Sequence, residues 1–530
     1  MTITSFSFLG FIILSLVIYH LFPVNKQWLV LLAASAVFYL SFSVSGLFVM
    51  ILTALLTYFA ALQVQKKKDE FQLWLTQNKS TADKETRKAA KALYQNRQKL
   101  YVAGTAAVII GVLFMSKYYK GLAADINGMF QTKLWTAENI LLPLGISYYS
   151  LQLIGYLVDV HRDIIPAEKN PLKVILYGGF FLSIMQGPFN RYNDLMPQIC
   201  VEERRKLTYH DIKFAVIKMA GGYIKKLCIA DQAALIANEV FNHYENYAGW
   251  QIVKGVICFA IQLYADFSGY MDIVIGIGQL FGITIPDNFR QPFFSKNMSE
   301  FWKRWHITLG MWLQDYVFYP VLKSSSFKKL GKSLTGKFGK EAGRRIPTYI
   351  GMMILWILIG AWHGAGMNYV FGVGILQFIY IFTGEIFAPV HQKFRNTLHI
   401  DDRSLPWHIF QSLRCTVLMM FAWIFFRSPS FNSASGFIGR LFAAPVSGNI
   451  LSAEAAGPDN EHYLGYLFVC SVVMLLIDLL HERGKSLRTI VSRKPYPVRL
   501  AFYLLLVFTL IVFGAYGTQY VPSNFIYFEF

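Results

Sequence analysis

One histidine of this chain stands deep inside an apolar run. His363 lies in the string WILIGAWHGAGMN, which covers residues 356–368, and its glycine neighbours are Gly360, Gly364 and Gly366. An ionisable group within such a run is costly unless it faces a cavity, a partner or a path for water. A neutral imidazole can remove a proton from an attacking hydroxyl at about pH 7, and the glycines would let a substrate approach the ring closely. His363 is therefore a candidate general base, with a structural histidine as the alternative.

A second histidine lies in a segment of mixed character. Residues 287–320 read DNFRQPFFSKNMSEFWKRWHITLGMWLQDYVFYP, which is too polar for a free membrane span and too aromatic for an ordinary loop. Tryptophan prefers the headgroup level and long basic side chains can reach water from there, so the segment favours a helix that lies in the interface or dips into the bilayer. An anchor helix without catalytic work is the alternative. The candidate residues of this segment are His306, Asn288, Trp302, Arg304, Trp305 and Asp315.

A third polar string interrupts an apolar stretch further upstream. Tyr264–Asp272 reads YADFSGYMD, and Gly269 in it indicates a kinked or closely packed helix. We expect Asp266 to be hydrogen-bonded to a neighbour, either as a buried structural acid paired with an arginine or as part of a catalytic site. A covalent route through Ser268 is open, but no nucleophile motif accompanies it.

Familiar catalytic and metal signatures are absent from the sequence. It contains no GxSxG, HExxH or GxxxxGK[ST] string, so interpretations as a hydrolase, a metalloprotease or an ATPase lose support. The cysteines are too far apart to form a CxxC pair, and most lie in apolar stretches: Cys200, Cys228, Cys258, Cys415 and Cys470. We therefore expect no metal site and no tightly bound cofactor.

Composition indicates which elements position these residues. Of 530 residues, 55% are hydrophobic and only 15% are charged, whereas globular chains carry about 25% charged residues. The net charge of +19 is explained by basic segments that face a membrane rather than by nucleic-acid binding, because the mean hydropathy is +0.39. A span needs roughly 20 apolar residues. We expect ten to twelve crossings, from runs near residues 6–22, 28–44, 46–64, 101–118, 139–159, 174–189, 213–236, 251–283, 347–382, 406–427, 463–480 and 500–518.

Charge predicts the orientation of these spans. Lys and Arg outnumber Asp and Glu by ten to four in residues 66–99, by eight to one in 323–345 and by six to one in 482–499. Positive segments are retained in the cytoplasm, so these three should be cytoplasmic and the N-terminus should lie outside. The run at 347–382 exceeds one crossing, and its glycines predict that it breaks or turns near His363.

Taken together, these strings resemble the membrane-bound O-acyltransferase (MBOAT) family, in particular its bacterial alginate O-acetyltransferase-like branch. The resemblance rests on PLGISYYSLQLIGYLVDVHR from residue 143, QGPFNRY from 186, YADFSGYMD, DNFRQPF, EFWKRWHITL, GAWHGA and the terminal FIYFEF. It implies an all-α polytopic membrane protein, with about 10–12 transmembrane helices plus interfacial or re-entrant helices around a central funnel. The whole chain, 1–530, would be one integral-membrane domain, comprising N-terminal spans at 1–64, a cytoplasmic basic helix or loop at 65–100, a catalytic core at 101–427 and C-terminal spans at 428–530.

The resemblance also implies roles for individual residues. The two hallmark histidines of the family correspond to His306 and His363, and the second would be the catalytic base. His306 would donate to a developing oxyanion or orient the donor, and Asp266, Asn288 or Asp315 would fix its tautomer. Supporting positions along a substrate channel would be Asp266, Ser268, Asn288, Trp302, Arg304, Trp305, Asp315, Trp362 and Gly364.

The implied reaction moves an acyl group, acetyl by first choice, from a cytoplasmic thioester to hydroxyls of an extracytoplasmic polysaccharide or to a partner acetyltransferase. The donor would be acetyl-coenzyme A or an acyl-carrier protein, attracted by the basic segment 323–345. The protein would reside in the bacterial cytoplasmic membrane. Alternatives are D-alanyl transfer to teichoic acid, a noncatalytic scaffold, or a polysaccharide or solute transporter, because broken helices with intramembrane charge also occur in transporters.

Overall fold

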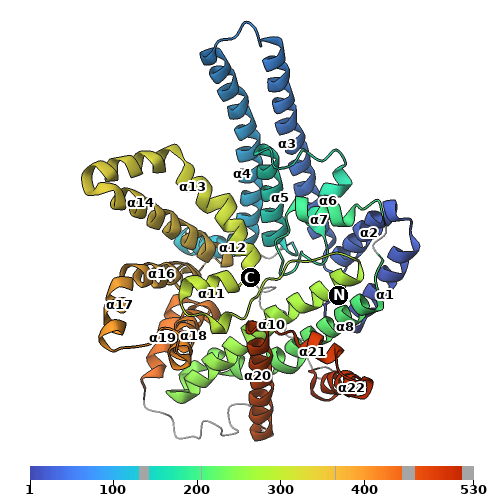
Figure 1. Cartoon of the computed structure of the whole chain (residues 1–530), viewed down its shortest axis with the longest axis vertical. Helices are drawn as coiled ribbons and strands as arrows, with labels where there is room; N and C mark the ends of the chain where they lie inside the picture. Colours follow the sequence, from blue (N-terminus) through green and yellow to red (C-terminus); the bar gives the residue numbers. More distant parts are fainter. Residues whose placement is uncertain (131–142, 204–205, 365, 444–459, 516–530) are drawn as a thin grey trace. The chain divides into compact units, whose positions relative to one another are not determined.

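The structure is a computed structural model that describes residues 1–130, 143–203, 206–364, 366–443 and 460–515, with the side chains of 120–130 and 460–464 left aside. Within these ranges the chain is helical and forms no β-strand; an isolated antiparallel bridge joins Phe289 to Trp305 (Figure 1). The predicted all-α fold class is therefore confirmed.

Eight of the described helices are long and apolar enough to cross a membrane, and two shorter apolar helices precede them at Phe6–Leu21 and Val24–Leu40. The long ones confirm the multi-span character predicted from hydropathy. They cover Val44–Gln77, Lys84–Tyr119, Trp250–Leu280, Ser325–His363, Met367–Ile386, Leu405–Arg427, Gly465–Glu482 and Tyr496–Phe513.

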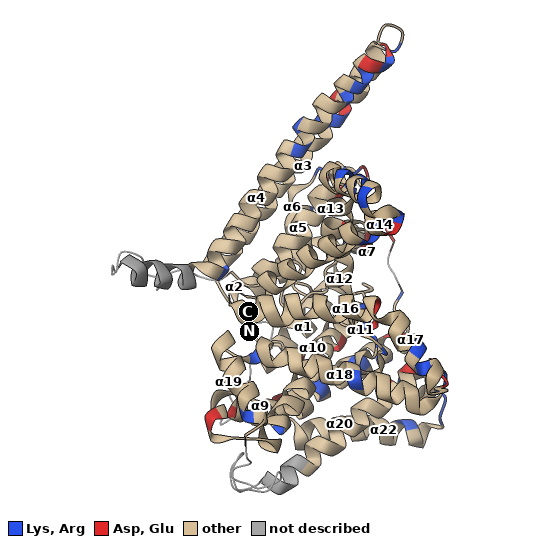
Figure 2. Ribbon diagram, turned by 90° about the vertical axis from the view of Figure 1, so that its left-hand side faces the viewer, with Lys and Arg blue, Asp and Glu red and all other residues tan. Residues whose placement is uncertain are grey.

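The chain divides into two compact units, the first comprising Met1–Asp211 and Ile277–Ile285. Its helices are α1 (Phe6–Leu21), α2 (Gln27–Leu40), α3 (Val44–Gln77), α4 (Lys84–Phe130), α5 (Ile146–His161), α6 (Pro171–Gly179) and α7 (Tyr192–Ile199). Helices α3 and α4 form a long antiparallel pair that carries its charged residues towards the tip (Figure 2). The basic segment expected at 65–100 is thus mostly helical, with a short connection between the two helices.

One expected span of the first unit is not a span-length helix. Helix α6 has nine residues, and the chain then continues through a buried non-helical turn to α7. Gly187 takes a positive φ of 87° and Pro188 follows it. Helix α6 already ends at Gly179, because Phe180 takes a ψ of 115° outside the helical range, so the apolar run near 174–189 was wrongly predicted to be a single span.

The second unit comprises Ile212–Gly276 and Pro286–Phe530. Its principal elements, of which the first begins just ahead of the unit, are α8 (Tyr209–Tyr223), the π-helical turn η2 (Ile224–Ala230), α9 (Asp231–Asn242), α10 (Trp250–Leu280), α11 (Met298–Arg304), α12 (Ile307–Leu313), the π-helical turn η5 (Gln314–Phe318), α13 (Tyr319–Lys323), α14 (Ser325–His363), α15 (Met367–Tyr369), the π-helical turn η6 (Val370–Ile375), α16 (Leu376–Ile386), α17 (Ala388–Thr397), α18 (Leu405–Arg427), α19 (Phe431–Leu441), α20 (Asn460–Glu482), α21 (Leu487–Ser492) and α22 (Tyr496–Phe513).

The break predicted near His363 is confirmed. Helix α14 ends at that residue, Gly364 is extended, and helical structure resumes at α15. A Cβ on Gly360 would lie 2.8 Å from the backbone of Val370, so the missing side chain lets η6 pack directly against α14. Glycine thus serves here to bring two backbones together.

The polar segment 287–320 does not form one interfacial helix. It is divided into α11, α12, η5 and α13, and large side chains such as Phe301 and Trp305 are buried within the unit. The sequence YADFSGYMD lies in the single helix α10, where Gly269 meets Gly222 of α8 at a close backbone crossing. The long run at 251–283 is therefore one continuous helix over Trp250–Leu280.

Candidate functional site

His306 and His363 line one chamber in the second unit. The chamber has a volume of about 350 Å³, and its walls come from α11, α12, η5, α14 and α16. Most of its lining is apolar, including Leu309, Leu313, Met352, Leu355, Ile359 and Ile381. Only a few polar and charged side chains line it, as is usual for sites that bind small molecules.

His306 is held in an unusual backbone conformation between α11 and α12. Its φ is 48°, in the left-handed region that non-glycine residues rarely adopt. The backbone on either side is fixed by Phe289 and Asn288, since Phe289 bridges to Trp305 and Asn288 O accepts from the N–H of Ile307. This strained backbone between two short helices turns a polar ring towards the chamber.

The side chain of Asn288 determines which ring nitrogen of His306 carries the proton. Asn288 Oδ1 accepts from the backbone N–H and from the hydroxyl of Thr308, each at 3.0 Å. A backbone N–H can only donate, so the atom that faces it is the amide oxygen. The Nδ1 of His306, 3.3 Å from the same oxygen, must therefore donate to it. The neutral ring is the Nδ1–H tautomer, which places the basic lone pair on Nε2.

Burial also keeps the ring of His306 neutral. The residue is 2% exposed and lies outside the membrane-spanning helices. Loss of hydration disfavours the imidazolium and lowers the pKa of His306 to about 3. Phe267 packs edge-on against the ring at a centroid distance of 4.8 Å.

His363 is the last residue of α14 and is 5% exposed. Its ring lies 4.8 Å from that of Trp362 and 5.5 Å from that of Phe426, at steep angles to both. Trp362 also approaches the ring of His306, at 6.4 Å. The two histidines thus share one indole neighbour as well as one chamber.

The predicted supporting residues have different surroundings. Trp302 and Trp305 line the chamber, and Asn288 touches it through His306. Gly364 ends α14, and a Cβ there would lie 2.6 Å from the ring of Tyr369. The chamber lining does not include Asp266, Ser268, Arg304, Asp315 or Trp362.

Asp266 forms part of a buried ionic cluster rather than the chamber wall. The Nζ of Lys226 lies 2.7 Å from Asp266 and 2.9 Å from Asp231, and all three side chains are 1–2% exposed. The partner of the acid is therefore a lysine from η2, not the arginine expected. Asp272 in the same sequence string is paired with Lys218 and Lys225.

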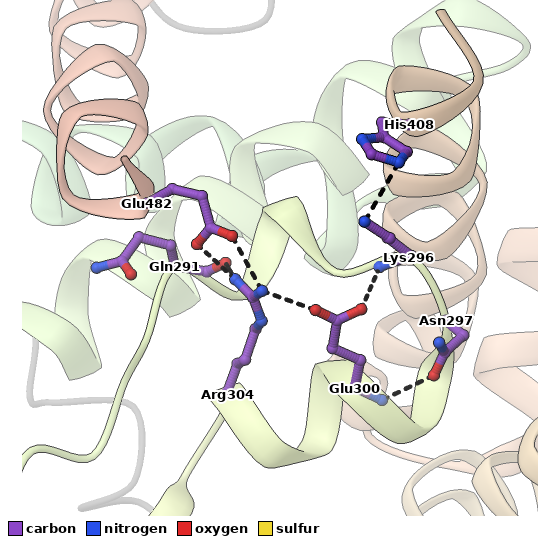
Figure 3. Close-up of polar contacts among 7 residues, drawn as sticks. All are labelled: Gln291, Lys296, Asn297, Glu300, Arg304, His408 and Glu482. Atoms are coloured by element: carbon purple, nitrogen blue, oxygen red, sulfur yellow. Dashed lines mark hydrogen bonds and ion pairs between the residues drawn. The ribbon is translucent and has the colours of Figure 1, made fainter. Parts of the chain in front are cut away.

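Arg304 connects α11 to α20 through ion pairs. Its guanidinium contacts both carboxylate oxygens of Glu482, at 2.6 and 3.0 Å, and Glu300 at 2.7 Å (Figure 3). Glu300 in turn accepts from the backbone N–H of Lys296, and Asn297 caps α11 by accepting from the N–H of Glu300. The figure shows the arginine directed towards these acids, which accounts for its charge without a ligand.

Several residues that line the chamber, or the small cavity next to it in the case of Gln377, were missed by sequence reasoning: Ser299, Lys303, Gln314, Trp356, Gln377 and Glu385. The signal for one of them was present. Gln377 is an uncharged polar residue inside an apolar run, and the rule that singled out His363 applies to it as well. The others lie on helices, and hydropathy alone does not determine which face of each helix points into the chamber.

Comparison with known sequences identifies relatives of the chain. A family profile described as MBOAT, membrane-bound O-acyltransferase family, matches residues 34–336, a range that includes His306 and ends before His363. The probable alginate O-acetylase AlgI of Azotobacter vinelandii is 30% identical over 367 residues, which cover 68% of this chain and 64% of the relative. The peptidoglycan O-acetyltransferase of Helicobacter pylori is 27% identical over 454 residues, covering 81% of this chain and 75% of that protein.

The name of a third relative indicates a different reaction. The teichoic acid D-alanyltransferase of Bacillus subtilis is 30% identical over 267 residues, which cover 47% of this chain and 62% of the relative. The chain spans about half to two thirds of the length of the alginate O-acetylases of Pseudomonas syringae and Azotobacter vinelandii. Since the family profile covers more than half of the chain, this multi-pass membrane protein belongs to the membrane-bound O-acyltransferase family.

Proposed function

We propose that the protein is an O-acyltransferase that moves an acyl group, acetyl by first choice, from a cytoplasmic thioester to hydroxyls of an extracytoplasmic polysaccharide. The observation that carries this proposal is the shared chamber of His306 and His363 in a chain of the MBOAT family. Relatives named alginate O-acetylase and peptidoglycan O-acetyltransferase support the acyl group and a glycan acceptor.

The chemistry requires a base for the acceptor hydroxyl and a group that orients the donor. His363 takes the proton of the acceptor hydroxyl as its oxygen attacks the thioester carbonyl, and general base catalysis of this kind contributes roughly 10² to 10⁴ in rate. The tetrahedral intermediate collapses, the carbon–sulfur bond breaks, and the proton on His363 passes to the departing thiolate. His306 orients the donor, because its Nε2 lone pair can accept a hydrogen bond from an amide N–H of the donor arm.

This assignment changes the role first expected for His306. Donation to an oxyanion needs an N–H that faces the substrate, whereas the proton of this ring is on Nδ1 and is directed to Asn288. The apolar lining of the chamber contributes in a different way from the two histidines. It excludes water that would otherwise hydrolyse the thioester.

The donor side of the protein is assigned from charge. The basic segment 323–345 begins at the last residue of α13 and continues into α14, which is kinked at Gly339 and ends at His363. Coenzyme A and acyl-carrier proteins are anionic, so a segment with eight positive residues and one negative residue would attract either. This charge supports the proposal that the donor binds from the cytoplasm and that the N-terminus lies outside, in a bacterial cytoplasmic membrane.

The acceptor side is assigned by family. A polysaccharide can receive the acyl group directly, or a separate extracytoplasmic acetyltransferase can take it first and complete the transfer. The two routes predict different products when the protein is expressed without its genomic neighbours. Direct transfer needs only donor and glycan, whereas relayed transfer leaves the glycan unmodified until the second enzyme is added.

The test compares ester content of the surface polysaccharide in cells that carry the wild type or His363→Ala. We expect the variant to lose nearly all of the ester that depends on the wild type. His391→Ala is the matched control, because His391 is exposed on α17. Normal ester content in His363→Ala at unchanged protein abundance would refute the proposal.

D-alanyl transfer to teichoic acid is the second candidate, favoured by the similarity to the Bacillus subtilis D-alanyltransferase. Mild alkaline hydrolysis followed by mass spectrometry distinguishes the two. Acetate in the hydrolysate supports the first proposal, and D-alanine supports the second.

A further inference from the structure

Gln377 is a polar residue buried in an apolar segment of the second unit. It is 1% exposed and lies at the beginning of α16, directly after the π-helical turn η6. Its Nε2 donates to the carbonyl oxygen of Gly372 at 3.2 Å, five residues earlier. Its Oε1 accepts from the indole N–H of Trp302 at 3.1 Å. Because an indole N–H can only donate, this contact fixes which end of the amide faces the tryptophan.

Trp302 is consequently held from three directions. The hydrogen bond comes from α16, the ring of Trp356 packs against it at 4.9 Å from α14, and the ring of Phe301 lies at 5.7 Å on its own helix. A side chain restrained in this way keeps one rotamer far better than a tryptophan packed only against apolar neighbours.

Trp302 stands at the boundary of two cavities. Besides the chamber of about 350 Å³, a cavity of about 20 Å³ lies behind it. Trp302, Trp305 and His363 line both. Gln377 lines the small cavity but not the chamber, together with the small residues Gly372 and Ala422. The two indoles and the imidazole of His363 therefore form a partition between the chamber and the small cavity.

We propose that Trp302 is the residue that limits the length of the transferred acyl group, and that Gln377 is the positioning residue that holds it in place. The inference rests on the proposed acyl transfer. In the proposed pose the reacting carbonyl lies within reach of His363, and the far end of the acyl chain points at the indole of Trp302. A short chain stops against the indole of Trp302, whereas a longer one would have to enter the space that the indole occupies.

The proposal makes a directional prediction for chain length. Replacement of Trp302 by a small residue joins the 20 Å³ cavity and the volume of the lost ring to the chamber. Longer acyl groups then fit and bury more apolar surface, which favours each added methylene by about fourfold. Loss of the Gln377 hydrogen bond alone loosens the indole without removing it, so its effect should be smaller and in the same direction.

The experiment measures the ratio of butyryl to acetyl esters on the surface polysaccharide of cells fed butyrate, by mass spectrometry of the released acids. We expect Trp302→Ala to raise this ratio at least tenfold and Gln377→Met to raise it severalfold. Gln377→Glu in its protonated form keeps an oxygen that can accept from the indole and an O–H that can donate to Gly372, so its ratio should stay close to that of the wild type. Trp250→Ala is the control, because Trp250 is 65% exposed on α10 and lines neither cavity.

Protein abundance in the membrane is measured alongside, so that loss of folding is recognised. If Trp302→Ala does not accumulate, Trp302→Phe supplies the test, with a smaller increase of the ratio expected. A fall in total ester at an unchanged butyryl-to-acetyl ratio in Gln377→Met and Trp302→Phe would overturn the inference, since it would show a merely structural role. Failure of the proposed function is a different result, namely ester content that does not depend on His363.

Discussion

The amide oxygen of Asn288 accepts three hydrogen bonds, one of them from Nδ1 of His306 at 3.3 Å. The other two donors belong to Thr308. One side chain thus fixes both the tautomer of the histidine and the first turn of α12.

Replacement of Asn288 by leucine should impair both functions of that oxygen. Each buried donor left without an acceptor costs about 1–3 kcal/mol, and the His306 ring loses its fixed tautomer. We expect a lower midpoint of thermal unfolding in detergent and a severalfold or greater loss of polysaccharide ester. Thr308→Val is the matched control, since it removes one hydrogen bond to the same oxygen and leaves His306 in contact with it. Equal ester loss in both variants would show that the tautomer of His306 is irrelevant.

The stability of the protein should depend on pH through His306. Its folded pKa, about 3, lies below the ordinary value of 6.5, so below about pH 6.5 the unfolded chain binds a proton that the folded chain does not. The contribution is complete above pH 6.5 and is lost as the pH falls towards 3, by up to about 1.4 kcal/mol per pH unit. Unfolding midpoints measured at pH 7 and pH 5 should therefore differ less for His306→Gln than for the wild type. An identical difference in the two proteins would contradict the neutral buried ring.

The pair of Lys226 and Asp266 should matter for folding more than for chemistry. Removal of one partner from a buried ion pair costs about 3–5 kcal/mol, because the remaining charge stays buried. Lys226→Met, which leaves two buried acids without their lysine, should therefore greatly reduce the amount of protein in the membrane, whereas Asp266→Ala, which leaves Lys226 paired with Asp231, should reduce it less. Immunoblots of membranes measure this directly. Normal abundance with no ester formed would instead support the catalytic interpretation of Asp266.

The close contact at Gly360 should not tolerate a side chain. A Cβ there would lie 2.8 Å from the backbone of both Tyr369 and Val370, so Gly360→Ala has to push η6 away from α14. We expect this to displace His363 and Gln377 relative to each other and to lower ester content at least tenfold. Gly384→Ala in α16 is the control, since no atom lies within 4 Å of the added carbon. Full activity of Gly360→Ala would mean that the two helices can separate without consequence.

Local signals in the sequence were sufficient for the fold class and for the end of α14. Hydropathy predicts a multi-span helical protein, and the glycines around His363 predict the break that the structure has there. The same hydropathy misjudged residues 174–189, because it does not register that the helix ends at Gly179 and is followed by a buried turn.

Long-range pairings were beyond the sequence. Gln377 meets Trp302 across 75 positions and Lys226 meets Asp266 across 40, and only the folded chain brings them together. The tautomer of His306 also depends on a long-range pairing. The sequence left three possible acceptors, Asp266, Asn288 and Asp315, and the folded chain brings Asn288 next to the ring. Whether a polar residue in an apolar run is structural or lines a cavity depends on such pairings.

The turn η6 constrains how the length of this chain can vary. A π-helical turn holds one residue more than an α-helical turn would, and the carbonyl of Gly372 that it frees is the one that Gln377 binds. Deletion of a single residue between Val370 and Ile375 would convert it to regular α-helix and rotate α16 by roughly 100°. An insertion or deletion that most surface loops absorb would here turn the amide of Gln377 away from the indole, so the spacing between His363 and Gln377 is part of the site itself.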